Sequence, residues 1–226
     1  MINANPFLFI TPREKSDELI GRFDFFEKIK KTVLGSLDEH AIVTINGDYG
    51  IGKSLFVKKV MEDLSSKKSL KIFYLDFNLN TLNDLRNIPT EKELGKQIII
   101  LIDRFELMLS LSNSLQEKIV KLMGELCQSK ITLILTTSDD LLKKMAKMDA
   151  KLKTYFKVLN VPPINLAEAK KLVISRLDEV KKKEKGSITP FTEEEIEKIH
   201  RNAKGNPRII LMLLASLYED RENKMQ

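Results

Sequence analysis

The sequence predicts an α/β protein: a five-stranded, mostly parallel sheet followed by a small all-helical region. Strand-length apolar runs alternate with amphipathic segments up to Pro162, which is typical of a parallel sheet with helices on both faces. The first of these runs, 41–45, leads directly into a glycine-rich turn and a helix. After Pro162 and Pro163 the pattern is helical only. We therefore expect a sheet domain over 1–162 and a helical domain over 163–226.

Each expected element has its own signal. In the first helix, Phe26, Ile29, Val33 and Leu37 recur at spacings of three and four residues, which gives one apolar stripe. The run 97–102 is continuously apolar, so we expect that strand to be covered on both faces. The expected strands are 41–45, 70–77, 97–102, 131–136 and 155–161. The expected helices are 23–37, 53–65, 115–128, 139–148, 166–182, 192–203 and 207–218.

The composition excludes several classes of protein. The chain has 226 residues, of which 42% are hydrophobic and 31% charged, as in ordinary globular proteins. Its single cysteine, Cys127, cannot form an internal disulfide, and two histidines are too few for a histidine-rich metal enzyme. No apolar run reaches the roughly 18 residues of a membrane span, and no signal-peptide pattern opens the chain. We expect a cytoplasmic protein, and the net charge of +6 suggests an anionic partner.

A phosphate-binding motif follows the first strand. Residues 47–54 read G-D-Y-G-I-G-K-S and match the pattern G-x-x-x-x-G-K-[ST] in full. In this motif backbone N–H groups and a helix N-terminus converge on phosphate oxygens. Lys53 is expected to reach the β- and γ-phosphates, and Ser54 to offer its hydroxyl to Mg²⁺. The residues expected to contact ATP or ADP here are Gly47, Asp48, Tyr49, Gly50, Ile51, Gly52, Lys53, Ser54 and Leu55.

An aspartate ends the buried third strand. Asp103 directly follows the apolar run 98–102. A carboxylate at this place can hold Mg²⁺ through water, opposite Ser54. The alternative is an aspartate that only caps the next loop. With the phosphate motif already present, we predict a magnesium site formed by Ser54 and Asp103.

The two motifs and the helical C-terminus together resemble an AAA+ ATPase, over about residues 5–220. Leu-Ile-Gly-Arg at 19–22 resembles a box that precedes the phosphate loop in several AAA+ and STAND families, and Gly-Asn-Pro-Arg at 205–208 resembles a lid motif of STAND and archaeal origin-recognition ATPases. The resemblance implies that Ile20, Gly21 and Arg22 lie against the adenine, that Pro207 packs near the base and that Arg208 reaches the phosphates. It also implies that Thr137 or Ser138 acts as the polar sensor near the γ-phosphate.

The sequence departs from the AAA+ pattern at the residues of hydrolysis. Most AAA+ enzymes have a glutamate directly after the strand-end aspartate, whereas this chain has Arg104. The nearest acid is Glu106, which can activate water only if the turn after Asp103 aims it inward. No arginine lies between Arg104 and Arg176, where a ring-forming relative carries its arginine finger. The sequence thus predicts slow hydrolysis.

Three functions remain open from the sequence. The first is an ATP/ADP-binding conformational switch with slow Mg²⁺-dependent ATPase activity, with Lys53, Asp103, Glu106, Thr137 and Arg208 as catalytic residues. The second is a DNA-binding initiator or loader ATPase, to which the net charge and a lysine series on the predicted helix 139–148 point, although no winged-helix pattern follows the lid. The third is a non-hydrolysing scaffold that retains ADP. An unidentified protein partner or self-association is expected in each case.

Overall fold

The chain divides into two compact units. The computed structural model describes residues 5–7, 19–39, 41–89, 94–180 and 185–225. Among them the sheet unit comprises 24–48 and 53–161, and the helical unit comprises 5–7, 19–23, 49–52, 162–180 and 185–225. His40 and the predicted end of the helix 166–182 lie outside the described residues.

The sheet unit is built on five parallel strands. They are β1 (Ile42–Asn46), β2 (Leu70–Asp76), β3 (Gln97–Asp103), β4 (Thr132–Thr137) and β5 (Phe156–Asn160). Their order across the sheet is β2-β3-β4-β1-β5, and every described pairing is parallel. This confirms the predicted α/β fold. Because parallel strands end at the same edge, the residues that follow β1, β3 and β4 meet there.

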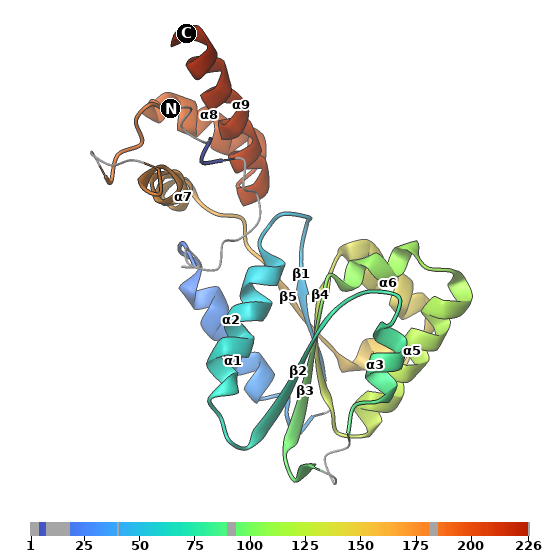
Figure 1. Cartoon of the computed structure of the whole chain (residues 1–226). Helices are drawn as coiled ribbons and strands as arrows, with labels where there is room; N and C mark the ends of the chain where they lie inside the picture. Colours follow the sequence, from blue (N-terminus) through green and yellow to red (C-terminus); the bar gives the residue numbers. More distant parts are fainter. Residues whose placement is uncertain (1–4, 8–18, 40, 90–93, 181–184, 226) are drawn as a thin grey trace. The chain divides into compact units, whose positions relative to one another are not determined.

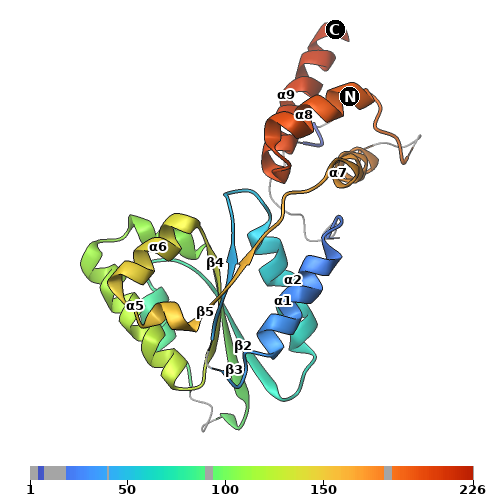
Figure 2. The same cartoon turned by 180° about the vertical axis from the view of Figure 1, so that it is seen from behind.

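Helices cover both faces of this sheet. Figures 1 and 2 show α1 and α2 on one face and α3, α5 and α6 on the other. The helices are α1 (Phe23–Leu34), α2 (Lys53–Ser65), α3 (Thr81–Arg86), α5 (Asn113–Gln128) and α6 (Asp139–Met148), with two 3-10 helices, η1 (Phe105–Ser110) and η2 (Leu152–Tyr155). The first helix ends three residues earlier than expected. Gly35, a poor helix former, follows it and opens a turn.

The core of the sheet unit surrounds β3. Residues 98–102 are at most 1% exposed, so this strand is covered on both faces as its continuous apolar run predicts. On the side of α5, Phe77 and Phe105 meet edge to face, with ring centroids 5.2 Å apart. This contact anchors the first residue of η1 directly after β3, and it therefore positions the residues that follow Asp103.

The helical unit contains α7 (Leu166–Asp178), α8 (Glu193–Ala203) and α9 (Pro207–Met225). Asn165 with Glu168 and Thr192 with Glu195 form capping boxes, which explains where α7 and α8 begin. None of the described helices is long and apolar enough to cross a bilayer.

Residues 5–7 pack into the core of this helical unit. Phe7 is fully buried, and its ring centroid lies 5.6 Å from that of Phe191. The side-chain amide of Asn5 donates to the carbonyl of Ala215 in α9. The predicted division placed these residues with the sheet, because a short apolar segment carries no sign of which core it joins.

Candidate functional site

The loop between β1 and α2 has the backbone that its glycines permit. Gly50 has φ 85° and Gly52 has φ 106°, a region in which a side chain is strained. Residues 47, 48, 53 and 54 of the motif belong to the sheet unit and 49–52 to the helical unit.

Lys53 begins α2 and turns its ammonium group back over the start of the loop. Its Nζ donates to the carbonyl oxygens of Gly47 at 2.8 Å and Asp48 at 3.1 Å. It also lies 3.3 Å from Oε1 of Glu106. The side chain is only 6% exposed. A buried cation at the N-terminus of a helix is an attractive partner for phosphate oxygens.

Ser54 and Asp103 meet as the sequence predicts. Ser54 Oγ donates to Asp103 Oδ1 at 2.9 Å, and the backbone N–H of Arg104 donates to the same oxygen, also at 2.9 Å. On the neighbouring strand, Tyr74 Oη donates to Asp103 Oδ2 at 3.2 Å. A hydroxyl and a carboxylate side by side are hard oxygen ligands, and this pair would suit Mg²⁺.

Tyr74 is a site residue that the sequence reasoning missed. Burial, and after it the nearby charge of Asp103, raise the pKa of the Tyr74 hydroxyl above its usual value. The hydroxyl therefore stays protonated and remains a hydrogen-bond donor to Asp103. Only strand pairing brings the two residues together, since they are far apart in the sequence.

The chain turns sharply after Asp103 and aims Glu106 inward. Arg104 adopts the left-handed conformation, with φ 54° and ψ 31°, immediately before η1. Its guanidinium forms a two-pronged ion pair with Asp76 at the end of β2. Glu106 instead points toward the phosphate loop and pairs with Lys53. The turn after Asp103 thus aims Glu106 toward the phosphate loop, which is the direction that its expected role requires.

At the end of β4, Thr136 faces this acid. Thr136 Oγ1 donates to Glu106 Oε2 at 3.1 Å and accepts from the N–H of Phe105 at 3.3 Å. The sequence reasoning favoured Thr137 or Ser138 as sensor and did not select Thr136. Because side chains alternate along a strand, Thr136 and its neighbour Thr137 point to opposite faces. This alternation is the sequence signal that separates Thr136 from Thr137 as candidates for the sensor position.

Thr137 belongs to a second polar cluster at the base of the loop. Its hydroxyl donates to Asn46 Oδ1 at 3.2 Å. The Asn46 amide donates to Asp139 at 2.7 Å and to Asn160 at 2.9 Å. Ser138 caps α6 by accepting from the N–H of Leu141. The cluster therefore joins the ends of β1, β4 and β5 directly before Gly47.

In the helical unit, the 20–22 segment contacts the tip of the loop. Arg22 Nη1 donates to the carbonyl of Ile51 at 2.8 Å, and the Arg22 N–H donates to Glu168 of α7 at 3.1 Å. Gly21 has φ 67°, a region that favours glycine, and a Cβ atom there would also lie 1.8 Å from Glu168 Oε1. Ile20, the first residue of this segment, is partly buried.

The start of α9 contacts the same loop tip within the helical unit. Asn206 donates to the carbonyl of Tyr49 at 3.0 Å and accepts from the N–H of Arg208 at 3.1 Å. The Arg208 guanidinium lies 4.2 Å from the centre of the Tyr49 ring, a cation–π contact. Pro207 is the first residue of α9, a position that suits its fixed φ.

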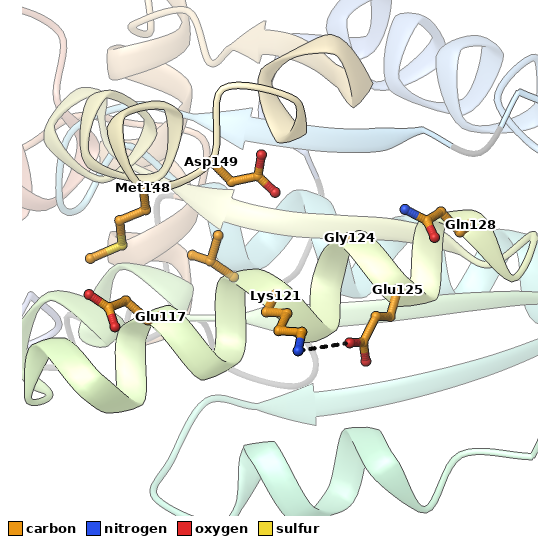
Figure 3. Close-up of a pocket in the computed structure, with 8 residues that line it drawn as sticks. Glu117, Lys121, Gly124, Glu125, Gln128, Met148 and Asp149 are labelled. Atoms are coloured by element: carbon orange, nitrogen blue, oxygen red, sulfur yellow. Dashed lines mark ion pairs between the residues drawn. The ribbon is translucent and has the colours of Figure 1, made fainter.

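A separate groove of about 420 Å³ lies on α5 and the end of α6 (Figure 3). It is lined by Glu117, Val120, Lys121, Gly124, Glu125, Gln128, Met148 and Asp149. Lys121 pairs with Glu125 at 4.0 Å across one helical turn. None of the predicted nucleotide-site residues lines this groove.

Comparison with solved structures shows which proteins share this fold. The ORC2 protein of Aeropyrum pernix, solved in ADPNP-ADP complexes, matches with TM-score 0.63 and 18% identity over 100% of this chain and 68% of that chain. Cdc6p of Pyrobaculum aerophilum matches with TM-score 0.64 and 14% identity, over 96% and 66%. Domain III of the Thermotoga maritima replication initiation protein DnaA gives 0.55 and 17%, over 96% and 93%. The chain thus spans about two thirds of the two archaeal proteins.

The family comparison is more specific. No curated protein sequence matches the chain. The family model described as Novel STAND NTPase 3 matches residues 26–190, which include the phosphate motif, Asp103 and the whole of α7. This confirms the predicted resemblance to STAND ATPases, and the structural matches confirm the resemblance to archaeal origin-recognition ATPases. The chain belongs to the Novel STAND NTPase 3 family.

Proposed function

We propose that this chain binds ATP and ADP and acts as a nucleotide-dependent conformational switch with slow, Mg²⁺-dependent ATP hydrolysis. The observation that carries the proposal is the arrangement at the edge of the sheet. A buried Lys53 inside the phosphate loop lies 3.3 Å from Glu106, and the Ser54–Asp103 pair is formed beside it. Membership of an NTPase family supports the proposed binding of nucleotide.

The proposed chemistry assigns a separate task to each group. Lys53 binds the β- and γ-phosphate oxygens. Ser54 and Asp103 would hold Mg²⁺, which would supply positive charge to the phosphates. Glu106 accepts the proton of the attacking water, because a carboxylate beside Lys53 lies next to the bound phosphate. The Arg104 guanidinium is paired with Asp76, so in this arrangement its positive charge is not offered to the phosphates. This supports a low rate of hydrolysis.

The contacts of the loop tip at Tyr49 support the conformational switch. Within the helical unit, Tyr49 contacts both Asn206 and Arg208 at the start of α9. A Cβ atom at Gly50 would meet Arg208 Cβ at 2.5 Å, so the backbone also packs closely there. Phosphate that reorders the loop changes these contacts, and Arg208 gains a stronger anionic partner than the Tyr49 ring. The helical unit can pass this change to a protein partner or a second copy.

Replacing either magnesium ligand is expected to abolish phosphate release. In single-turnover assays with ATP and excess Mg²⁺, Ser54→Ala and Asp103→Asn lose at least about 100-fold in rate, because the charge that Mg²⁺ neutralises is no longer held. Ser66→Ala, on the exposed surface after α2, is the matched control and keeps the wild-type rate.

Two results would contradict parts of this proposal. If Asp103→Asn releases phosphate as fast as wild type, Asp103 is not the magnesium ligand. If wild type releases none, the hydrolysis claim fails and the purified protein is then examined for bound nucleotide. ADP that survives purification and does not exchange with ATP identifies the non-hydrolysing scaffold instead.

DNA binding is a second candidate function with its own observation. Lys143 and Lys147 are exposed on α6, and Lys151 is exposed shortly after it. A structure of the Aeropyrum pernix ORC1 protein in complex with DNA matches the chain with TM-score 0.60 and 15% identity, over 96% of this chain and 64% of that chain. Lysines at this spacing can neutralise successive phosphates of a nucleic-acid backbone.

The DNA-binding proposal predicts a steep dependence on salt. Affinity for a fluorescent duplex is expected to fall about 10-fold or more between 50 and 200 mM salt, since each lysine–phosphate contact releases counterions. A triple variant, Lys143→Ala, Lys147→Ala and Lys151→Ala, flattens that slope. Absence of binding at low salt removes this candidate and leaves the switch proposal intact.

A further inference from the structure

Oxygen atoms of the sheet unit surround the Lys53 ammonium group. Its Nζ donates to the carbonyl oxygens of Gly47 and Asp48 and forms an ion pair with Glu106, 3.3 Å from Oε1. An ammonium group has only three donors, and these two carbonyl oxygens already take two of them. A phosphate oxygen that approaches Lys53 therefore competes with Glu106 for the place beside the ammonium group.

Glu106 is the partner that can give way. The two carbonyl oxygens belong to the backbone of the phosphate loop. The Glu106 carboxylate instead ends a side chain with rotatable bonds, and this side chain is 24% exposed. Its other oxygen stays bonded to Thr136, so the carboxylate remains next to the loop after it releases Lys53. The acid is thus an anion held beside the lysine that is proposed to bind the nucleotide phosphates.

The charge of the nucleotide decides how strongly this anion competes. ATP carries a γ-phosphate that ADP lacks, and Lys53 is the group that reaches it. A partly buried carboxylate beside the negatively charged γ-phosphate raises the free energy of the ATP complex, because like charges repel more strongly away from bulk water. The ADP complex has no γ-phosphate and escapes most of this repulsion.

We infer that Glu106 sets the nucleotide preference of the site: it occupies the position of the γ-phosphate and favours ADP over ATP in the resting protein. This inference rests on the proposed function, because it assumes that Lys53 binds nucleotide phosphates. It gives Glu106 two effects of opposite sign. The carboxylate weakens ATP binding and at the same time supplies the base that hydrolysis needs.

Isothermal titration calorimetry with Mg²⁺ tests the inference, with ADP and the non-hydrolysable analogue AMP-PNP as ligands. In Glu106→Gln the ratio of the two dissociation constants, AMP-PNP over ADP, is expected to fall by about tenfold, because the repelling charge is gone while the shape of the side chain is kept. Glu106→Ala is expected to lower the ratio as well. Phosphate release from ATP falls in the same variants.

Glu117→Gln is the matched control, since it removes the same charge from α5 in the sheet unit without touching the loop. Its ratio stays at the wild-type value. An unchanged ratio in both Glu106 variants, with both nucleotides still bound through Lys53, overturns the inference alone. If wild type binds neither nucleotide, or if Lys53→Ala binds both as well as wild type does, the proposed function fails and the inference fails with it.

Discussion

Lys53→Ala is expected to weaken binding of both ADP and ATP by about 100-fold or more. The Lys53 ammonium is the cation that the motif places over the phosphates, and it is only 6% exposed, so water does not replace it well. The substitution also leaves Glu106 without its cationic partner beside the loop, which repels phosphate further. Calorimetric titration with each nucleotide measures the loss.

Lys58→Ala is the control for this variant. Lys58 lies on the same helix, α2, and is exposed to solvent. Its removal changes the net charge equally and leaves affinity within about twofold, because exposed charges contribute little. Equal losses in the two variants would mean that general charge, and not the loop lysine, governs binding.

Phe105→Ala is expected to lower the free energy of unfolding by about 3–5 kcal/mol, the range found when buried phenylalanines are truncated. Phe105, the first residue of η1, is fully buried and packs edge to face on Phe77. Its N–H also donates to Thr136 Oγ1, the group that holds Glu106. Denaturant unfolding followed by circular dichroism measures the change.

Phe23→Ala provides the comparison for the core substitution. Phe23→Ala removes the same kind of ring at the start of α1, where Phe23 is 62% exposed. We expect it to change the free energy of unfolding by less than about 0.5 kcal/mol. A loss below about 1 kcal/mol in Phe105→Ala would show that η1 can repack without this anchor.

The site divides into residues that local patterns reveal and residues that strand pairing assembles. Lys53 and Ser54 belong to one contiguous motif, and Asp103 ends a recognisable buried strand, so their meeting follows from parallel strands ending at one edge. Tyr74 and Thr136 enter the site from β2 and β4. No short-range pattern links residues so far apart in the chain, because hydrogen bonding between strands places them.

The direction of the Glu106 side chain is a further property that local sequence patterns do not predict. The sequence offers Glu106 as the nearest acid after Asp103 but carries no sign of where its side chain points. A left-handed Arg104, held by Asp76, turns the chain so that Glu106 faces Lys53. A non-glycine residue in this conformation costs energy, and the surrounding packing and the ion pair stabilise it.

Local patterns of the chain therefore predict the fold class, the phosphate-loop motif and the strand-end aspartate that meets Ser54, because hydrophobic period, glycine positions and strand ends are local properties. The tertiary structure alone decided that Glu106 pairs with Lys53, that Thr136 holds this acid, and that Phe7 joins the helical unit. These facts depend on which distant surfaces pack together. The free energy of that packing is shared by the whole core, so no single segment encodes it.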